Sequence, residues 1–450
     1  MHSSLVAFVS RASAEGRNER SRFPELPVLR ELAASLASRV RPRLDGVGLI
    51  CVQHLLETTG SLMETLFGLG LHPSNSFILG KAYSTNQDVV DRLRQCGSHV
   101  DGGSLPSSLG TFEDAIAADL VQLWSAASAL RRPDIHTLII LDDGGRCLAS
   151  VPHWARQDGR RMCGVEQTQF GADRLGLVSL PVVLVARSGV KKWIEPPMIA
   201  RAVKRRIASV VARCGPKTTV GVVGLGPIGK AVAEELLRNG LQVLAYDNAA
   251  TPEWPGKGVR KCSRLRQLVE DSTMVFGCTG ADIFEAAGLD EYPSIGCRAL
   301  ASCSSEDIEF RSVLRRYADA VPLGPSQALQ DVLCQVGNHE LRVLRGGFPV
   351  NFDGTKESVP ASEIQVTRGL LLGGVVQALL MTELPSIPAT GSFQLASAVQ
   401  DCVMRSWLAA ENPSEGDYFR GVRSAETRAR LINASSGVPR LPEIERAMML

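Results

Sequence analysis

A glycine-rich segment, Gly224-Leu225-Gly226-Pro227-Ile228-Gly229, has the GxGxxG spacing that can hold a pyrophosphate group. It follows the apolar run VGVV and leads into the segment IGKAVAEELLRNG, which has helical periodicity. In this context the first two glycines let backbone amides approach the phosphates, and the third lets helix and strand pack closely. Asp247 lies 18 residues beyond Gly229, where an acid can accept a hydrogen bond from a ribose 2′-hydroxyl. Because Asn248 follows and no arginine is adjacent, the segment predicts NAD rather than NADP.

Polar side chains follow four other apolar runs, at the point where each predicted strand ends. His54 follows VGLICVQ, and Asp143 lies in the Asp-Asp-Gly-Gly segment after HTLIIL. Thr85 ends the Tyr-Ser-Thr cluster after SFILG, and Lys191 follows LPVVLVARS. Ligands of doubly wound sheets bind beyond the carboxyl ends of the strands, so these side chains could meet around one ligand. Taken singly, His54 could equally be a core histidine, and the Asp-Asp-Gly-Gly segment could be a simple turn.

Lys191 and Glu195 are four residues apart, a spacing at which lysine and glutamate commonly pair on a helix. Pro196 and Pro197 follow directly, and we expect them to begin a helix over 196–212, since proline is tolerated in a first turn. That start would place Lys191 and Glu195 ahead of the helix, which argues against a simple helix pair.

Strand-like and helix-like segments alternate along the chain, which predicts parallel sheets with helices on both faces. We expect an α/β fold of two doubly wound, Rossmann-like domains, with the NAD domain inserted in the substrate domain. The expected parts are a mobile tail over 1–24, a substrate domain over 25–198 and 353–450 with a C-terminal helical tail, and an NAD-binding domain over 199–352. Strands are expected at 47–54, 76–80, 136–145, 180–188, 220–223, 241–246, 273–280 and 298–303.

The composition argues against several functional classes. Lysine plus arginine number 49 and aspartate plus glutamate 47, so a net charge of +2 offers no extended positive surface for nucleic acid. The longest apolar run, 369–381, is interrupted by Gln377, and the N-terminal run 5–9 is too short for a signal-peptide core. The 11 cysteines include no CxxC and the histidines no HExxH, so no metal site is predicted. We expect a cytoplasmic protein with neither a membrane nor a nucleic-acid partner.

From about Phe23 to about Leu380, the order of these clusters resembles the S-adenosyl-L-homocysteine hydrolase family. The similar segments are HLLETTGSLMETL, YSTNQD, LDDGG, GVEQTQFG, SGVKKWIE, the glycine loop, CTG, DIEF and PVNFDG. The resemblance implies a tightly bound NAD that oxidises a ribose 3′-hydroxyl, followed by elimination, water addition and re-reduction. It also implies a nucleoside-like small-molecule substrate and a homo-oligomer.

Carried over residue by residue, the resemblance implies three sets of site residues. The catalytic groups would be His54, Asp143, Lys191 and Glu195, the last standing where the family has an aspartate. Substrate contacts would be Thr85, Gln167, Thr168 and Ser305. Thr279, Gly280 and Asn351 would join the glycine loop and Asp247 in binding the cofactor.

The chain departs from that family where substrate would bind. Gln167 replaces a glutamate, Ser305 replaces a histidine, and no Gly-His-Pro follows Asn351. The terminal segment RLPEIERAMML has no counterpart of the family's Lys/Tyr tail. These differences favour a divergent hydrolase relative with a changed substrate or a partial reaction.

Two other functions stay open at this stage. The glycine-loop segment also looks like that of D-2-hydroxyacid dehydrogenases, although the strand ending in ASCSSED lacks the arginine of that class. A non-catalytic NAD-binding regulator is the other alternative, because Gln167 and Ser305 replace ionisable groups.

Overall fold

The computed structural model describes residues 23–106, 110–157, 159–214, 218–249, 258–286, 288, 297–318, 327–410, 424–434 and 437–449. Almost all of the expected tail over 1–24 lies outside these residues. The chain divides into two compact units. Unit 1 contains Met1–Gly103, Ala118–Lys192 and Pro360–Leu450, and unit 2 contains Ser104–Ala117 and Trp193–Val359.

Unit 1 is built on a seven-stranded sheet in which every neighbouring pair is parallel. Its strand β1 (Val47–Gln53) is buried along its whole length, as expected for a strand with helices on both faces. In spatial order the strands are β14 (Gly391–Gln394), β6 (Pro181–Leu184), β5 (Arg161–Glu166), β4 (Thr137–Asp142), β1 (Val47–Gln53), β2 (Ser76–Gly80) and β3 (His99–Asp101).

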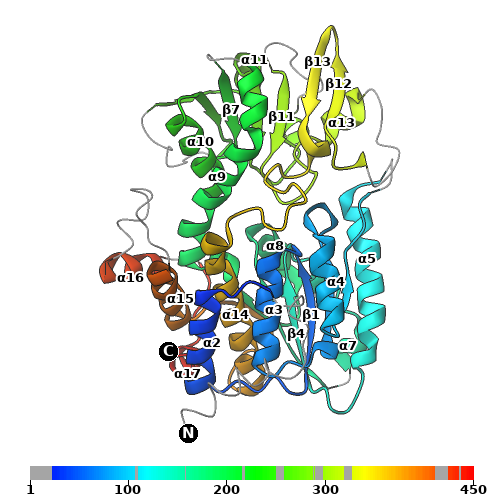
Figure 1. Cartoon of the computed structure of the whole chain (residues 1–450), viewed down its shortest axis with the longest axis vertical. Coiled ribbons are helices and arrows are strands. Elements are labelled where there is room, and N and C mark those ends of the chain that lie inside the picture. The colour runs from blue at the N-terminus through cyan, green and yellow to red at the C-terminus, as the bar shows by residue number, and fades with distance from the viewer. Residues whose placement is uncertain are drawn as a thin grey trace. The chain divides into compact units, whose positions relative to one another are not determined.

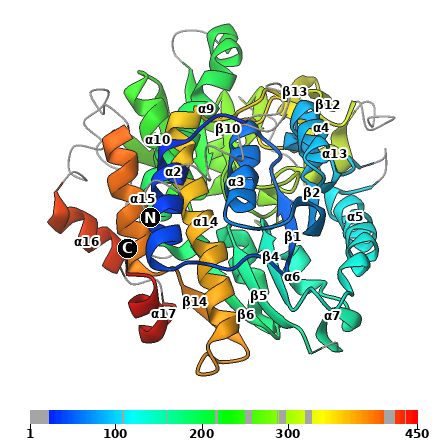
Figure 2. The same cartoon turned by 60° about the horizontal axis from the view of Figure 1, so that its bottom comes forward.

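The helix α14 (Ala361–Glu383) forms the centre of the helical layer of unit 1. It packs against β4, β5 and β6 and contacts α2 (Pro27–Arg39) and α15 (Ser397–Ala410), which lie beside it in Figure 2. By length and composition it is the one described helix that could cross a membrane, but 89% of its apolar window is buried inside the protein. A helix that is apolar on all sides and buried in this way is a core helix.

The other described helices of unit 1 are shorter than α14 and lie around the sheet and α14 (Figure 1). They are α3 (Glu57–Gly68), α4 (Gln87–Gln95), α6 (Arg146–Ala149), α7 (His153–Gln157), α8 (Gln169–Arg174), α16 (Ala425–Asn433) and α17 (Pro442–Ala447), with 3-10 turns at Pro73–Asn75, Ala82–Ser84, Ser128–Leu130, Leu175–Leu177 and Val185–Arg187.

Unit 2 contains a second seven-stranded sheet, with one antiparallel pair at its edge. In spatial order its strands are β12 (Val332–Val336), β13 (His339–Val343), β11 (Ala299–Ser302), β10 (Met274–Gly277), β7 (Thr219–Val223), β8 (Gln242–Tyr246) and β9 (Val259–Lys261). Among its described residues, this unit also contains α10 (Pro227–Arg238), α11 (Leu265–Asp271), α12 (Ile283–Ala286), α13 (Arg311–Tyr317) and a 3-10 turn at Leu344–Gly347.

The alternation of side chains along the strands of unit 2 supplies two cores, one on each face of the sheet. Met274 and Phe276 of β10 pack in one core with residues of α10, whereas Val275 packs in the other with residues of α11 and α13. Both faces are therefore covered, as the alternating pattern predicts.

Both sheets follow the strand order of a doubly wound fold, which confirms the predicted fold class. In unit 1 the chain builds outward from β1 to β3 and then returns to β4 on the other side of β1. In unit 2 it builds from β7 to β9 and returns to β10 beside β7. The strand order thus reverses between β1 and β4 and between β7 and β10, and ligands of such sheets bind beyond these reversals.

Two helices carry the chain from one unit to the other. The helix α5 (Phe112–Ala127) begins in unit 2, where Phe112 packs edge-on against Phe348 with ring centroids 5.8 Å apart. That contact explains why 104–117 belongs to unit 2, although the sequence placed it in the substrate domain. The sequence also placed the NAD domain at 199–352, whereas unit 2 resumes at Trp193 and ends at Val359.

The helix α9 (Gly189–Cys214) starts earlier than the sequence predicts, and the expected start at Pro196 is wrong. Ser188 caps it, because its Oγ accepts a hydrogen bond from the amide of Lys191 at 3.3 Å. Pro196 and Pro197 therefore lie inside the helix, and Lys191 and Glu195 share it at i,i+4 spacing. The two prolines lack the amide donors of a regular helical turn. Burial of Val190 and Ile194 in this first part of α9 offsets the free energy of the lost hydrogen bonds.

Candidate functional site

The glycine loop of unit 2 follows β7 and leads into α10. Gly224 has a φ of +88°, and a Cβ there would lie 2.8 Å from the carbonyl oxygen of Cys278. A Cβ on Gly229 would lie 1.8 Å from the carbonyl oxygen of Gly224. Around Gly226, by contrast, no heavy atom of the described residues lies within 4 Å of the Cβ position. The fold itself therefore requires Gly224 and Gly229, whereas Gly226 leaves open the space that a pyrophosphate would fill.

Two further features fit a bound dinucleotide. Pro227 is the first residue of α10, and a first-turn proline leaves the other amides of that turn directed at the loop. Asp247 follows β8, and its two carboxylate oxygens accept hydrogen bonds from the amides of Leu225 at 2.5 Å and Ala249 at 2.8 Å. Asp247 thus fixes the glycine loop, while its predicted contact with a ribose hydroxyl stays a prediction.

The turn after β10 is held by a buried carboxylate, Glu309. Its Oε1 accepts hydrogen bonds from the amides of Thr279 and Gly280, both at 2.6 Å, and its Oε2 accepts one from Thr279 Oγ1 at 2.9 Å. Ser304 Oγ also donates to it. Burial raises the pKa of Glu309, and these hydrogen bonds oppose that rise. Glu309 therefore shapes the turn beside Gly224, a role that sequence analysis missed.

Asn351 and Ser305 also lie in unit 2, near the end of β11. The amide of Val350 donates to the carbonyl oxygen of Ser302 at 3.0 Å, which places the buried Asn351 beside that strand end. Ser305 is half-buried in the loop that follows β11. The predicted substrate contacts are thus divided, because Thr85, Gln167 and Thr168 belong to unit 1.

In unit 1, a buried ion pair lies at the strand reversal between β1 and β4. Lys81 Nζ donates to Asp143 Oδ1 at 2.5 Å, and each side chain is only 1% exposed. His54 Nε2 lies 3.5 Å from the other oxygen of Asp143. Three side chains that follow three adjacent strands, β1, β2 and β4, therefore meet here.

A serine hydroxyl holds one side of the His54 ring. Its Nδ1 lies 2.6 Å from Ser84 Oγ, and that hydroxyl donates to the carbonyl oxygen of Lys81 at 3.0 Å. Ser84 therefore orients the imidazole ring, with Nε2 facing Asp143. Burial lowers the pKa of His54 to about 3, so the ring is neutral at pH 7.

The charges around Asp143 keep it ionised. Burial alone would raise its pKa, but Lys81, His54 and Lys191 lower the pKa of Asp143 to about 2. Lys191 is half-buried near the start of α9 and also contributes to the low pKa of His54. His54 and Asp143 therefore lie together, and Lys191, a third predicted catalytic residue, acts on both electrostatically. Glu195 lies further along α9, in the part assigned to unit 2.

A second pair of buried carboxyl groups lies beside Asp143. Asp142 and Glu166 are register partners at the ends of β4 and β5. Burial raises the pKa of Asp142 to about 6, and burial together with Asp142 raises the pKa of Glu166 well above its usual range. Glu166 Oε1 accepts hydrogen bonds from the amide and hydroxyl of Thr168, both at 2.7 Å. Burial and the neighbouring Asp142 therefore favour the protonated form of Glu166.

The predicted substrate contacts of unit 1 have different structural surroundings. Thr168 caps α8 through the amide of Gly171, and Thr85 Oγ1 donates to the carbonyl oxygen of Lys81 at 3.0 Å. Gln167 is buried, and its Oε1 has no hydrogen-bond partner among the described residues. Lys81, which sequence analysis missed, directly follows β2, so the strand-end rule that selected Thr85 could have found it.

Comparison with known proteins gives one family match. The model of the NAD-binding domain of D-isomer specific 2-hydroxyacid dehydrogenases matches residues 204–281. Two uncharacterised proteins of Mycobacterium tuberculosis, from strains CDC 1551 / Oshkosh and ATCC 25618 / H37Rv, are each 33% identical over 350 residues. The matched region is 77% of this chain and 66% of each relative, so it spans just under two thirds of their length.

Among solved structures, several that are similar to this chain are dehydrogenases. A D-lactate dehydrogenase from Aquifex aeolicus, complexed with NAD and lactic acid, is 17% identical with a TM-score of 0.25, covering 40% of this chain and 60% of its own. A D-isomer specific 2-hydroxyacid dehydrogenase family protein from Aeromonas salmonicida is 13% identical with a TM-score of 0.35. The match covers 72% of this chain and 94% of that protein's chain.

These findings correct the resemblance to S-adenosyl-L-homocysteine hydrolases. The family match places the glycine loop, Asp247 and the turn at Thr279 in a 2-hydroxyacid dehydrogenase type of domain. The predicted hydrolase or lyase activity and the nucleoside-like substrate are therefore wrong. The prediction of NAD is confirmed, because the matching domain is an NAD-binding domain. The error arose because polar residues at strand ends are common to all doubly wound sheets.

Proposed function

We propose that this chain is an NAD-dependent oxidoreductase of the D-2-hydroxyacid dehydrogenase type, acting on a small 2-hydroxy acid or the matching 2-oxo acid. The observation that carries the proposal is the glycine loop with its open space at Gly226, inside the segment that the family model matches. NAD, when bound, supplies the acceptor for a hydride from the carbon that bears the hydroxyl.

In this proposal unit 2 holds the cofactor. Gly224, Gly226 and the first turn of α10, with Pro227 and Ile228, take the pyrophosphate, and Asp247 takes a ribose hydroxyl. The turn at Thr279 and Gly280, fixed by Glu309, and Asn351 complete the predicted cofactor contacts.

Unit 1 would supply the acid–base group. Oxidation of an alcohol requires a base for the hydroxyl proton, and a neutral imidazole can accept it on its unprotonated ring nitrogen. We assign this role to His54, whose ring is neutral at pH 7, and the anionic Asp143 beside it opposes the effect of burial by favouring the imidazolium. Among the described residues of unit 2 the one histidine is His339, which is exposed on β13.

Lys191 is the candidate for the substrate carboxylate. It is a half-buried cation that acts electrostatically on His54 and Asp143, so a carboxylate paired with it would lie near the base. Lys81 is already committed to Asp143 and holds it ionised.

Two broader predictions accompany this function. A homo-oligomer is expected, and light scattering coupled to size-exclusion chromatography measures its mass. A cytoplasmic location is expected, and fractionation of the source cells tests it.

The decisive experiment compares Gly226→Val with Gly68→Val. Both glycines have no described heavy atom within 4 Å of the Cβ position, so both variants should fold. Val at 226 would occupy the pyrophosphate space, whereas residue 68 lies at the end of α3 in unit 1. We expect Gly226→Val to lose NAD binding by at least about a hundredfold in titration calorimetry, and Gly68→Val to bind as the unmodified protein does. Equal NAD affinity in the two variants would refute the cofactor site.

The activity assay follows the absorbance of reduced nicotinamide with a panel of D- and L-2-hydroxy acids, and with 2-oxo acids in the reverse direction. Turnover of at least one D-2-hydroxy acid is expected. NAD binding without turnover of any panel member would overturn the enzyme assignment in favour of an NAD-binding regulator.

A further inference from the structure

We propose that Cys278 and Cys303 form a redox-active thiol pair, which a peroxide converts into a disulfide that weakens the binding of NAD. Both are free cysteines of unit 2, and each directly follows a strand, Cys278 after β10 and Cys303 after β11. The effect on NAD rests on the cofactor site proposed above, whereas the acid–base group of unit 1 takes no part in it.

The strand register places the two cysteines side by side. Gly277 and Ser302 are register partners at the ends of the parallel strands β10 and β11. Cys278 and Cys303 are the next residues, and the amide of Cys303 continues the pairing by donating to the carbonyl oxygen of Gly277 at 2.8 Å. Neighbouring strands lie about 4.8 Å apart, which falls within the Cα separations of about 4.4–6.8 Å that disulfides span.

The two side chains also lie on the same face of the sheet. Cys303 belongs to the core that Met274 and Phe276 of β10 share with residues of α10, and Cys278 packs against that core. A hydrogen bond joins the two thiols. Cys297, which precedes β11, packs in the core on the other face. Cys303 is therefore the thiol that Cys278 meets, although Cys297 lies close to it in the sequence.

The oxidation of this pair by hydrogen peroxide is balanced without a further reactant. Each thiol loses a proton and an electron, one S–S bond forms, and the O–O bond of the peroxide breaks to give two water molecules. Cys278 is half-buried and Cys303 is only 8% exposed, so the peroxide reaches Cys278 first. The sulfenic acid formed there is attacked by Cys303, and a water molecule leaves.

The surroundings of Cys278 keep it reduced until an oxidant is present. Its hydrogen bond with Cys303 and its burial raise the pKa of Cys278 well above the usual range. Cys278 is therefore a thiol at neutral pH, and it responds to sustained exposure to peroxide and not to brief contact. In a reducing compartment a disulfide of this kind is transient and acts as a redox sensor.

Cys278 is packed directly against the glycine loop. A Cβ on Gly224 would lie 2.8 Å from its carbonyl oxygen, and a Cβ on Gly229 would lie 3.2 Å from its own Cβ. The turn that follows Cys278 is the one that Glu309 holds. A covalent bond brings two sulfur atoms closer than a hydrogen bond does, so the disulfide draws the two strand ends together. Close-packed interiors transmit such shifts, so the space for the pyrophosphate changes shape and NAD binds more weakly.

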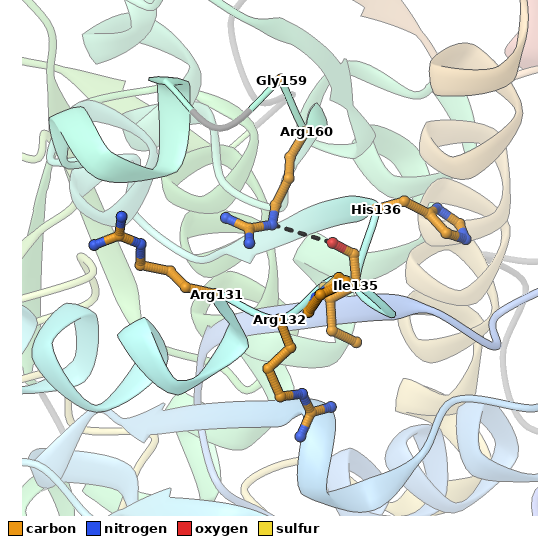
Figure 3. A pocket seen from close by; sticks show the side chains of 7 residues that line it. Arg131, Arg132, Ile135, His136, Gly159 and Arg160 are labelled. Carbon is orange, nitrogen blue, oxygen red and sulfur yellow. Dashed lines mark hydrogen bonds between the residues drawn. The ribbon is translucent and has the colours of Figure 1, made fainter.

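The pocket that Figure 3 shows plays no part in this reaction. It lies in unit 1, at the start of β4, and its described lining residues include Arg131, Ile135 and Arg160 but no cysteine. A molecule that occupies this pocket therefore contacts none of the thiols, and it does not interfere with a test of the thiol pair.

The test uses the full chain with and without hydrogen peroxide. After oxidation the remaining thiols are blocked with iodoacetamide, and the unreduced tryptic peptides are analysed by mass spectrometry. We expect a disulfide between the peptides 267–298 and 299–311, which contain Cys278 and Cys303. In titration calorimetry the oxidised chain should bind NAD at least about tenfold more weakly, and dithiothreitol should restore the affinity.

Cys297→Ser is the matched control, because the peptide 267–298 also contains Cys297. This variant should keep the cross-link and the loss of NAD affinity, whereas Cys278→Ser and Cys303→Ser should abolish both. Thermal unfolding verifies that each variant is folded. Absence of the cross-link in the folded, unmodified chain would overturn the proposal, and so would a cross-link that persists in Cys278→Ser. Unchanged NAD affinity in the cross-linked chain would overturn it as well.

Failure of the proposed cofactor site gives a different result. A reduced chain that binds no NAD would refute that site and, with it, the effect of the disulfide on NAD. The peptide cross-link is measured without NAD, so it tests the thiol pair by itself.

Discussion

Replacing Lys81 by methionine should strongly destabilise unit 1. Lys81 and Asp143 form an ion pair of 2.5 Å in which both side chains are 1% exposed. Removing one partner of such a pair leaves an uncompensated buried charge, which costs about 3–5 kcal/mol. Methionine has nearly the length of the lysine stem, so little of this cost would come from an empty cavity.

The cost should depend on pH in a defined direction. Lys81 is the main group that lowers the pKa of Asp143 to about 2, against the effect of burial. Without Lys81 burial dominates, and the pKa of Asp143 rises. The variant then relieves its buried charge by taking up a proton, so its deficit should be largest near pH 7.5 and should shrink toward pH 5.

Urea denaturation measures this deficit. The fluorescence of Trp124 and Trp407, which are buried in unit 1, reports the transition. The control is Arg30→Met, which breaks an exposed ion pair and should cost no more than about 1 kcal/mol. The double variant Lys81→Met with Asp143→Asn should recover much of the loss, because neither charge of the pair remains. A loss below about 1 kcal/mol for Lys81→Met, or a loss that does not vary with pH, would refute the reasoning.

Two other predictions concern the same sheet edge. In the folded protein the pKa of Asp142 is raised to about 6 and that of Glu166 well above its usual range, so the stability from this pair is present at low pH and is lost as pH rises through about 6. Glu166→Gln should therefore flatten the fall of the thermal midpoint between about pH 5 and pH 8, and an unchanged slope would contradict it. His54→Gln should lower kcat by about a hundredfold or more while NAD affinity stays the same. A variant that keeps its full kcat would show that the base lies elsewhere.

The most local signals in the sequence predicted the structure best. The segment 76–80 is a strand with the predicted bounds, and the glycine loop joins β7 to α10 as its spacing predicts. Both depend on short-range rules of apolar burial and glycine geometry. By contrast, β14 has the sequence GSFQ and pairs with β6, about 200 residues earlier, so neither its composition nor its neighbours marked it as a strand.

The other prediction errors arose at residues that lie in an environment unusual for their type. A lysine is normally solvated, so Lys81 attracted no attention, although Asp143 makes its burial possible. Two prolines usually mark a helix start, but the cap at Ser188 begins α9 earlier. The function was misassigned because strand-end polar residues report the fold class and not the reaction.

Unit 1 is assembled from three separate chain segments, and this affects the order in which the two units fold during synthesis. The edge strand β14 and the core helix α14 are made only after the whole of 193–359 has left the ribosome. At about 5–20 residues per second, the first half of unit 1 waits on the order of ten to thirty seconds for them. During that time the faces of β4, β5 and β6 that α14 will cover stay open. Unit 2 can complete its own sheet in the same interval, so the nascent chain should finish its second unit before its first. Chaperones that bind apolar strands would then act on the earlier segment.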